Sequence, residues 1–306
     1  MQRRTLLAAA VAAPIGAAIA AAPASAHHGN GRYPSVINLP RGFCPEGIAR
    51  GTGTKIYVSS MADGCIWCAD LRTGNGMLLV PPVSGTQATG LDVERGRIWA
   101  ACGNMGGAAV YRESTGECLA TYDFGGGFID GVTATKKAVF FTDSKKAKVY
   151  CVEFGRNGSL PGQSGVRTLR LPGGLGDPTG CNTGIVAAWA DKLIIVQAKT
   201  GRLYCFDPRA GMAAQISTGG VSVCNGDGLL LEGRTLYVVR NRNNVIAKFR
   251  LNERLTRATP IDVIRDRDLD EPSAVVSFGS SLYAVNARLS VPATPDTTYC
   301  VVRVRD

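Results

Sequence analysis

Short apolar segments, each followed by a polar stretch, recur along the chain at nearly regular intervals. They read KIYVSS, RIWAAC, AVFFTD, KLIIVQ, TLYVVR and SLYAVN, and their third residues are Tyr57, Trp99, Phe140, Ile194, Tyr237 and Tyr283. These residues are 42, 41, 54, 43 and 46 positions apart. Segments rich in β-branched and aromatic residues predict strands, and a steady period indicates a repeat architecture.

Each repeat holds four short strands joined by polar turns. In the first repeat they are EGIARG, KIYVSS, CIWCADL and GMLLVP. Six such units predict an all-β protein, a six-bladed β-propeller whose innermost strands line a central channel. We expect the early strand SVINLP, residues 35–40, to close the ring by pairing with the last blade. The long interval, residues 155–180, predicts a surface excursion between blades three and four.

The first 26 residues differ in composition from the repeats. Arg3 and Arg4 precede an apolar stretch of alanine and leucine that ends in the small residues ASA. This pattern predicts a secretory signal peptide of twin-arginine type, cleaved before His27. We therefore expect a signal at 1–26, a flexible N-terminus at 27–34 and the propeller at 35–306. The mature protein is expected to be secreted, without a membrane anchor.

Charge and histidine content narrow the function classes. Loss of the signal lowers the formal net charge from +10 to +8. A moderately basic exported protein suits a small-molecule ligand, including an anionic one, and the chain has no nucleic-acid motif. The only histidines are His27 and His28, so a Ser-His-Asp hydrolase lacks its base within the repeats.

The ten cysteines raise two questions. Cys65 and Cys68 have the spacing of a redox or zinc motif, but Cys68 occupies a repeat position and Cys65 has no counterpart in the other repeats. Residues three apart on a strand also point to opposite faces. Cys181 and Cys224 enter neighbouring blades and are the best candidates for a disulfide; other pairings stay open.

Acidic residues recur where the inner strands begin. The residues that precede the recurrent small residue are Glu46, Thr89, Asp130, Thr183, Asp227 and Pro272. The predicted fold places them around one mouth of the channel. Three carboxylates that converge there repel one another unless a cation or protons offset their charge, and oxygen ligands suit a hard divalent ion. The alternative is that acids at turn starts only cap their loops.

Basic residues occupy the tips of the hairpins that join the second and third strands of a repeat. These tips are expected at the same mouth of the channel. The residues are Lys145, Lys146, Lys148, Lys199, Arg202 and Arg242. A basic rim over an acidic floor predicts an anionic substrate, bound by Asp130, Lys145, Lys199, Arg202 and Arg242. Sugar acids, lactones and phosphorylated metabolites fit this description, and solvated hairpin lysines are the alternative.

The blade starts Glu-Gly, Asp-Gly, Asn-Thr-Gly and Asp-Gly resemble those of the senescence marker protein, gluconolactonase and luciferin-regenerating enzyme family, within the strictosidine-synthase-like propellers. The resemblance covers the whole mature chain. It implies a hydrolase of lactones or esters that uses one divalent cation. Calcium is favoured, and magnesium, manganese and zinc are alternatives.

The resemblance also implies roles for individual residues. Glu46 and Asp227 match family metal ligands, and Asp227 also matches the general base. Thr183 stands where the family has a ligand Asn, with Asn182 beside it as a substitute. Gly131 follows Asp130 where the family has Asp. These departures favour the alternative function, a non-catalytic ligand-binding or cell-wall-associated propeller that has lost the full metal site.

Overall fold

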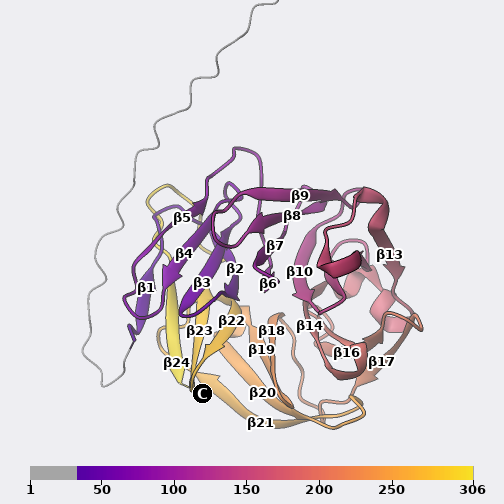
Figure 1. Cartoon of the computed structure of the whole chain (residues 1–306). Helices are drawn as coiled ribbons and strands as arrows, with labels where there is room; N and C mark the ends of the chain where they lie inside the picture. Colours follow the sequence, from indigo (N-terminus) through magenta and orange to yellow (C-terminus); the bar gives the residue numbers. More distant parts are fainter. Residues whose placement is uncertain (1–32, 306) are drawn as a thin grey trace, which may run out of the picture.

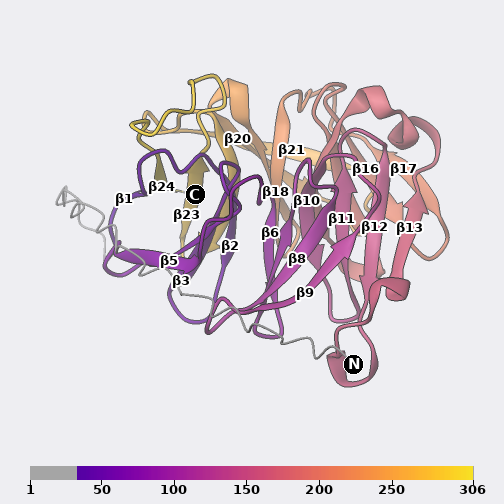
Figure 2. The same ribbon diagram turned by 90° about the horizontal axis from the view of Figure 1, so that it is seen from above.

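The computed structural model describes residues 33–305, whose strands form six four-stranded antiparallel sheets. Figure 1 shows these sheets as six blades around a common axis, which confirms the predicted propeller. Figure 2, at a right angle to this view, shows the neighbouring inner strands β6 and β10 side by side. The predicted signal peptide, residues 1–26, lies outside the described residues.

Blades one to five follow the chain from the inner strand to the outer strand. Their strands are β2 (Pro45–Arg50), β3 (Lys55–Ser60), β4 (Ile66–Asp70) and β5 (Gly76–Val80); β6 (Leu91–Glu94), β7 (Arg97–Ala101), β8 (Gly107–Arg112) and β9 (Cys118–Asp123); β10 (Ile129–Ala134), β11 (Ala138–Asp143), β12 (Lys148–Glu153) and β13 (Val166–Arg170); β14 (Asn182–Ala187), β15 (Leu193–Gln197), β16 (Arg202–Asp207) and β17 (Met212–Ile216); and β18 (Gly226–Glu232), β19 (Thr235–Arg240), β20 (Val245–Leu251) and β21 (Ala258–Arg265).

Blade six joins the two ends of the described chain. Its strands are β22 (Pro272–Phe278), β23 (Ser281–Asn286), β24 (Cys300–Arg305) and the early strand β1 (Val36–Asn38). β1 is the outer strand and pairs antiparallel with β24, and its residue Ile37 is fully buried. This confirms the predicted closure of the ring by the last blade.

The segment 155–180 differs from its prediction as a surface excursion. It contains β13, the outer strand of blade three, which pairs with β12. The sequence VRTLR of β13 is largely exposed, so its hydrophobic pattern is too weak to mark a strand. Short 3-10 turns make up much of the remainder of this segment and recur in two later loops: η1 (Arg156–Gly158), η2 (Gln163–Gly165), η3 (Gly173–Gly176), η4 (Pro178–Gly180), η5 (Trp189–Asp191) and η6 (Asn241–Asn243). No helix in residues 33–305 has the length and apolar character needed to span a membrane.

The hydrophobic core lies between neighbouring blades. Each of six buried clusters joins the facing sides of two adjacent sheets. Between blades two and three, for example, Trp99 packs against Phe141, and Tyr122 stacks on Trp99. Alternating residues of each strand serve the two neighbours, so every blade is apolar on both faces. The ring therefore depends on each sheet fitting both neighbours.

Glycines allow the inner strands to approach one another closely around the axis. A Cβ at Gly184 would lie 2.0 Å from the carbonyl oxygen of Asp227 in the next blade. The same crowding occurs at four more inner-strand glycines, Gly47, Gly90, Gly131 and Gly228. Residues with a Cβ would force the inner strands apart, so these glycines set the width of the channel.

We predict that Gly184→Ala lowers the free energy of unfolding by about 1 to 3 kcal/mol, because the methyl group overpacks the interface of blades four and five. Gly162→Ala is the matched control: its φ is −73° and a Cβ there meets nothing within 4 Å. Chemical denaturation measures both variants. Equal stabilities would contradict the role of the inner-strand glycines.

Candidate metal centre

Local irregularities in the inner strands determine where the side chains of the mouth residues point. The register shifts near the start of the inner strand in five blades, between Pro45 and Ile48 in blade one and at equivalent places in blades three to six. A bulge re-aims a side chain that regular pleating would place elsewhere. The residues within these bulges include Glu46, Asp130 and Asp227, and all three line the channel.

These three carboxyl groups form one compact cluster. Each offers an oxygen atom, and the three oxygens lie within 4.8 Å of one another. Glu46 is 9% exposed and Asp227 8% exposed, and the buried Oε2 of Glu46 has no hydrogen-bond partner. The predicted convergence of the three carboxylates is confirmed. A cation would satisfy the unpartnered oxygen and offset the mutual repulsion.

Hydroxyl residues of the even-numbered blades alternate with the carboxylates of the odd-numbered blades. Thr89 Oγ1 donates to the carbonyl of Ile129 at 2.7 Å, and Thr183 Oγ1 donates to the carbonyl of Gly226 at 2.9 Å. Ser273 Oγ donates in the same way to the carbonyl of Glu46. Each hydroxyl therefore braces the backbone at, or directly before, a carboxylate of the next blade.

This pattern corrects the position predicted for blade six. Pro272 pairs with Asn286, as Pro45 pairs with Ser60 in blade one, so Pro272 occupies the position before the mouth residue. Ser273 is the true equivalent of Glu46. The sequence did not reveal this shift because blade six has Ser-Ala where the other blades have a residue followed by glycine.

Aliphatic residues close the channel beneath the carboxylates. The lining residues two positions after each mouth residue are Ile48, Leu91, Val132, Ile185, Leu229 and Val275. The space enclosed with the carboxylates is about 70 Å³. Since a water molecule occupies about 30 Å³, this space suits an ion with its immediate ligands rather than an organic substrate.

Burial in this setting shifts the proton affinity of the cluster. Burial is the main cause in each case: it raises the pKa of Asp130 to about 8 and that of Asp227 to about 7. The pKa of Glu46 also lies well above its ordinary value, because of burial and then the charges of Asp227 and Asp130. Without a cation, the cluster therefore retains protons near neutral pH.

Two further residues at the mouth, Asn241 and Ser144, escaped sequence reasoning, and Cys181, which the sequence had singled out, lies near them. Asn241 Nδ2 donates a hydrogen bond to Asp227 Oδ2 at 3.0 Å. This bond lowers the pKa of Asp227 and so counteracts part of the increase that burial causes. Ser144 lowers the pKa of Asp130 in the same way. Burial and the nearby charge of Asp130 raise the pKa of the Cys181 thiol. Asn241 lies in the quoted hairpin tip NRNN, but nothing in the sequence singles it out from its neighbours.

The residues assigned by resemblance have other hydrogen-bond partners. Thr183 braces blade five, as described above, and Asn182 Nδ2 donates to the carbonyl of Leu175 at 3.1 Å. Neither residue lines the channel space that the carboxylates enclose. Their roles as metal ligands stay predictions. The third carboxyl group of the cluster, beside those of Glu46 and Asp227, belongs to Asp130.

Five of the six predicted basic residues are exposed and Lys148 is half-buried, and their hairpins lie at the mouth end of the blades. Asn182 pairs with Gln197 and Gly226 pairs with Arg240, which places the following tips beside the starts of the inner strands. These tips carry Lys145, Lys199, Arg202 and Arg242. Lys145 Nζ donates to Asn104 Oδ1 at 2.9 Å. Their contact with a substrate stays a prediction.

All ten cysteines, each within the described residues, are free thiols. The predicted disulfide between Cys181 and Cys224 is therefore wrong; the thiol of Cys224 instead donates to the carbonyl of Lys199. Cys65 packs in the cluster between blades six and one, whereas Cys68 packs against the cluster between blades one and two. The two thiols face opposite sides of the sheet, as expected, and form no joint site.

Comparison with known proteins identifies the fold. No protein-family model matches the chain, and a search of curated proteins finds no relative. Solved structures do match. The Malassezia sympodialis allergen Mala s 1 is 16% identical with a TM-score of 0.69, over 89% of this chain and 96% of its own. A catalytically inactive histidine-to-alanine variant of virginiamycin B lyase from Staphylococcus aureus is 14% identical with a TM-score of 0.60, over 82% and 80%.

A third structure is a putative 6-phosphogluconolactonase from Bacteroides fragilis, 14% identical with a TM-score of 0.56, over 78% and 76% of the two chains. At these identities the likeness shows the fold. The chain thus has the fold of a six-bladed propeller, similar to that of these lyase and lactonase-like structures. Fold alone does not assign an activity.

We predict that the stability of the protein in a chelator falls as the pH rises from 5 to 8. A carboxyl group whose folded-state pKa is raised favours folding while it is protonated, and this contribution is lost as the pH passes through the folded pKa. Asp130→Asn cannot ionise, so we expect it to be more stable than the parent at pH 8 by at least about 1 kcal/mol.

Chemical denaturation in EDTA at several pH values tests this expectation. Asp296→Asn, which changes a carboxylate with a 91% exposed side chain, is the control and should follow the parent. A parent whose stability rises over this pH range would show that the cluster does not carry excess protons.

Proposed function

We propose that this protein is a divalent-metal-dependent hydrolase of a lactone or ester. The observation that carries the proposal is the cluster of Glu46, Asp130 and Asp227, with its buried oxygen that lacks a partner. A ligand set made only of oxygen atoms favours calcium, magnesium or manganese over softer ions such as zinc. The hydroxyls of blades two, four and six support this set by holding its backbone in place.

The three carboxylates would hold the cation directly. When bound, a divalent cation polarises a carbonyl group and lowers the pKa of water. Asp227 is best placed to accept a proton: Asn241 holds its Oδ2, which leaves Oδ1 free of that bond.

The substrate would bind above the carboxylates, at the mouth. The aliphatic ring blocks approach from below, and the enclosed space is too small for an organic molecule. The hairpin tips that carry Lys145, Lys199 and Arg242 lie at this end of the blades. Their positive charges favour an anionic substrate, such as the lactone of a sugar acid.

Histidine content favours hydrolysis over the lyase chemistry of a structural neighbour. The neighbouring lyase is inactive when one histidine is replaced by alanine. In this chain the only histidines, His27 and His28, precede the propeller. A reaction that needs histidine as its acid or base therefore has no candidate among residues 33–305.

We predict that the protein binds one divalent cation and that Asp130→Asn weakens this binding at least about a hundredfold, because a buried charged ligand is lost. Thr183→Val is the matched control: it removes a hydroxyl that braces the backbone but is not a ligand in our proposal. Calorimetry with calcium, magnesium and manganese measures both. Loss of binding in Thr183→Val with normal binding in Asp130→Asn would support the ligand set implied by resemblance.

A screen of lactones and esters with the metal-loaded protein tests the activity. We expect turnover that disappears in Asp227→Asn and that is strongest for anionic lactones. Stoichiometric metal binding without turnover of any tested lactone or ester would contradict the hydrolase proposal and favour the non-catalytic ligand-binding propeller.

Export is a separate part of the proposal and rests on the N-terminal sequence. The basic head, apolar stretch and small-residue end of residues 1–26 support cleavage before His27. N-terminal sequencing of the protein recovered outside the cytoplasm tests it, and retention of residues 1–26 would contradict it.

A further inference from the structure

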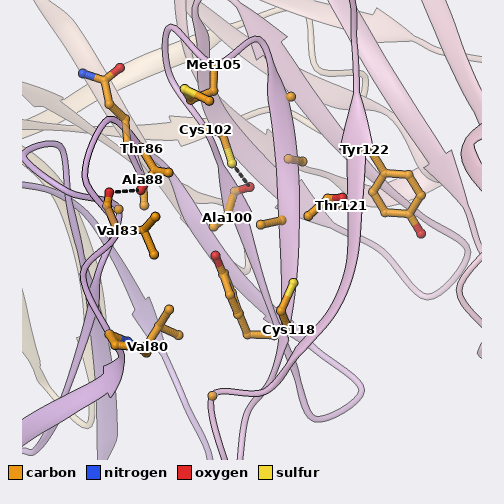
Figure 3. A pocket seen from close by; sticks show the side chains of 18 of the residues that line it. Val80, Val83, Thr86, Ala88, Ala100, Cys102, Met105, Cys118, Thr121 and Tyr122 are labelled. Atoms are coloured by element: carbon orange, nitrogen blue, oxygen red, sulfur yellow. Dashed lines mark hydrogen bonds between the residues drawn. The ribbon is translucent and has the colours of Figure 1, made fainter. Parts of the chain in front are cut away.

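A second cavity, of about 580 Å³, lies between blades one and two. It shares no lining residue with the channel space that holds the carboxylates. One wall is the face of β7, β8 and β9, and the other is the end of β5 with the loop that follows it. Figure 3 shows Val80 and Val83 on one side, opposite Ala100 and Cys118. We call this cavity the slot.

The slot exists because blade two presents two small side chains where blades one, three and four each present a large one. Ala100 pairs with Ala109 on the face toward blade one. The equivalent pairs are Val58 with Trp67 in blade one, Phe141 with Tyr150 in blade three, and Ile195 with Tyr204 in blade four. Large side chains at these positions fill the space beside blades one, three and four, and blades five and six have intermediate pairs, Val238 with Ala247 and Ala284 with Val302. The two alanines of blade two leave a gap between its sheet and the loop that follows β5.

The lining of the slot is apolar and carries little charge. The side chains include Val80, Val83 and Met105, and the last two are 55% and 54% exposed. Asp123 is the only charged residue of the lining, which contains no lysine or arginine. An anion therefore finds no partner here, in contrast to the basic tips at the mouth of the channel.

The polar side chains of the slot other than Asp123 are uncharged. Burial raises the pKa of Cys102 and that of Tyr111 to about 12, so both are neutral at physiological pH. The thiol of Cys102 donates to the carbonyl of Ala100 within its own blade. Cys118 is exposed and lies where a reagent can reach it. Few polar groups in an apolar cavity of this size are typical of a small-molecule site.

We propose that the slot binds a neutral, flat, apolar small molecule, an aromatic or alicyclic ring compound without an anionic group. The shape follows from the gap between the sheet of blade two and the loop after β5, and the neutrality follows from a lining whose only charged residue is Asp123. The ligand completes the packing that a large side chain provides in blades one, three and four. This proposal is independent of the metal centre.

The neutral fluorescent probe N-phenyl-1-naphthylamine tests the proposal. We expect saturable binding at one site per chain, with a rise in probe fluorescence, in chelator as well as in calcium. Ala109→Tyr introduces the residue that Tyr150 and Tyr204 provide in blades three and four, and should weaken binding at least about tenfold by filling the slot. Ala214→Tyr, on the exposed outer strand β17, is the matched control and should bind as the parent does.

Thiol reactivity gives a second readout that needs no variant. Bound probe should slow the alkylation of Cys118 by a neutral maleimide, but not that of Cys224 at the mouth, as peptide mass mapping can resolve. Absence of saturable binding would overturn the proposal. Equal binding by a folded Ala109→Tyr, or equal alkylation of Cys118 with and without probe, would also overturn it. If Ala109→Tyr does not fold, the alkylation result decides alone.

Discussion

The close approach of the six inner strands is the constraint on which the rest of this structure depends. Glycine follows the mouth residue in five blades, and at Gly184 a single methyl group would collide with the neighbouring backbone. Strands that meet this closely leave a narrow channel. The narrow channel in turn brings together side chains from blades that are far apart in the sequence, such as Glu46 and Asp227.

That proximity creates an electrostatic problem at the mouth of the channel. Three carboxyl groups share a buried space above an aliphatic floor, and their removal from water is costly unless protons or a cation balance the charge. Bracing hydroxyl groups alternate with the carboxylates around the channel. Thr89, Thr183 and Ser273 each hold the backbone at, or directly before, an acidic residue, so they support the positions of the three carboxyl groups. In our proposal, a divalent cation balances this charge.

The repeat period was sufficient to predict the blades, their closure by β1 and the meeting of Glu46, Asp130 and Asp227. These features follow from spacing, which a single sequence displays directly. The shift at Pro272 was not predictable because blade six lacks the marker glycine, and only the pairing with Asn286 reveals it. The role of Asn241 depends on how one hairpin tip folds over Asp227.

The slot between blades one and two was also hidden from the sequence. Ala100 and Ala109 are ordinary strand residues, and their small size matters only because of the surface that faces them across the interface. Cavities of this kind depend on the fit between two blades, whereas sequence patterns report each blade separately. The strand β13 was mistaken for an excursion for another reason: its largely exposed residues give too weak a hydrophobic pattern.

The most direct test of the metal centre is anomalous diffraction from crystals of the protein soaked in manganese. Our account predicts one strong anomalous peak within coordination distance of the carboxylate oxygens of Glu46, Asp130 and Asp227. A peak at another place, or an occupied channel mouth without anomalous signal under saturating manganese, would contradict it.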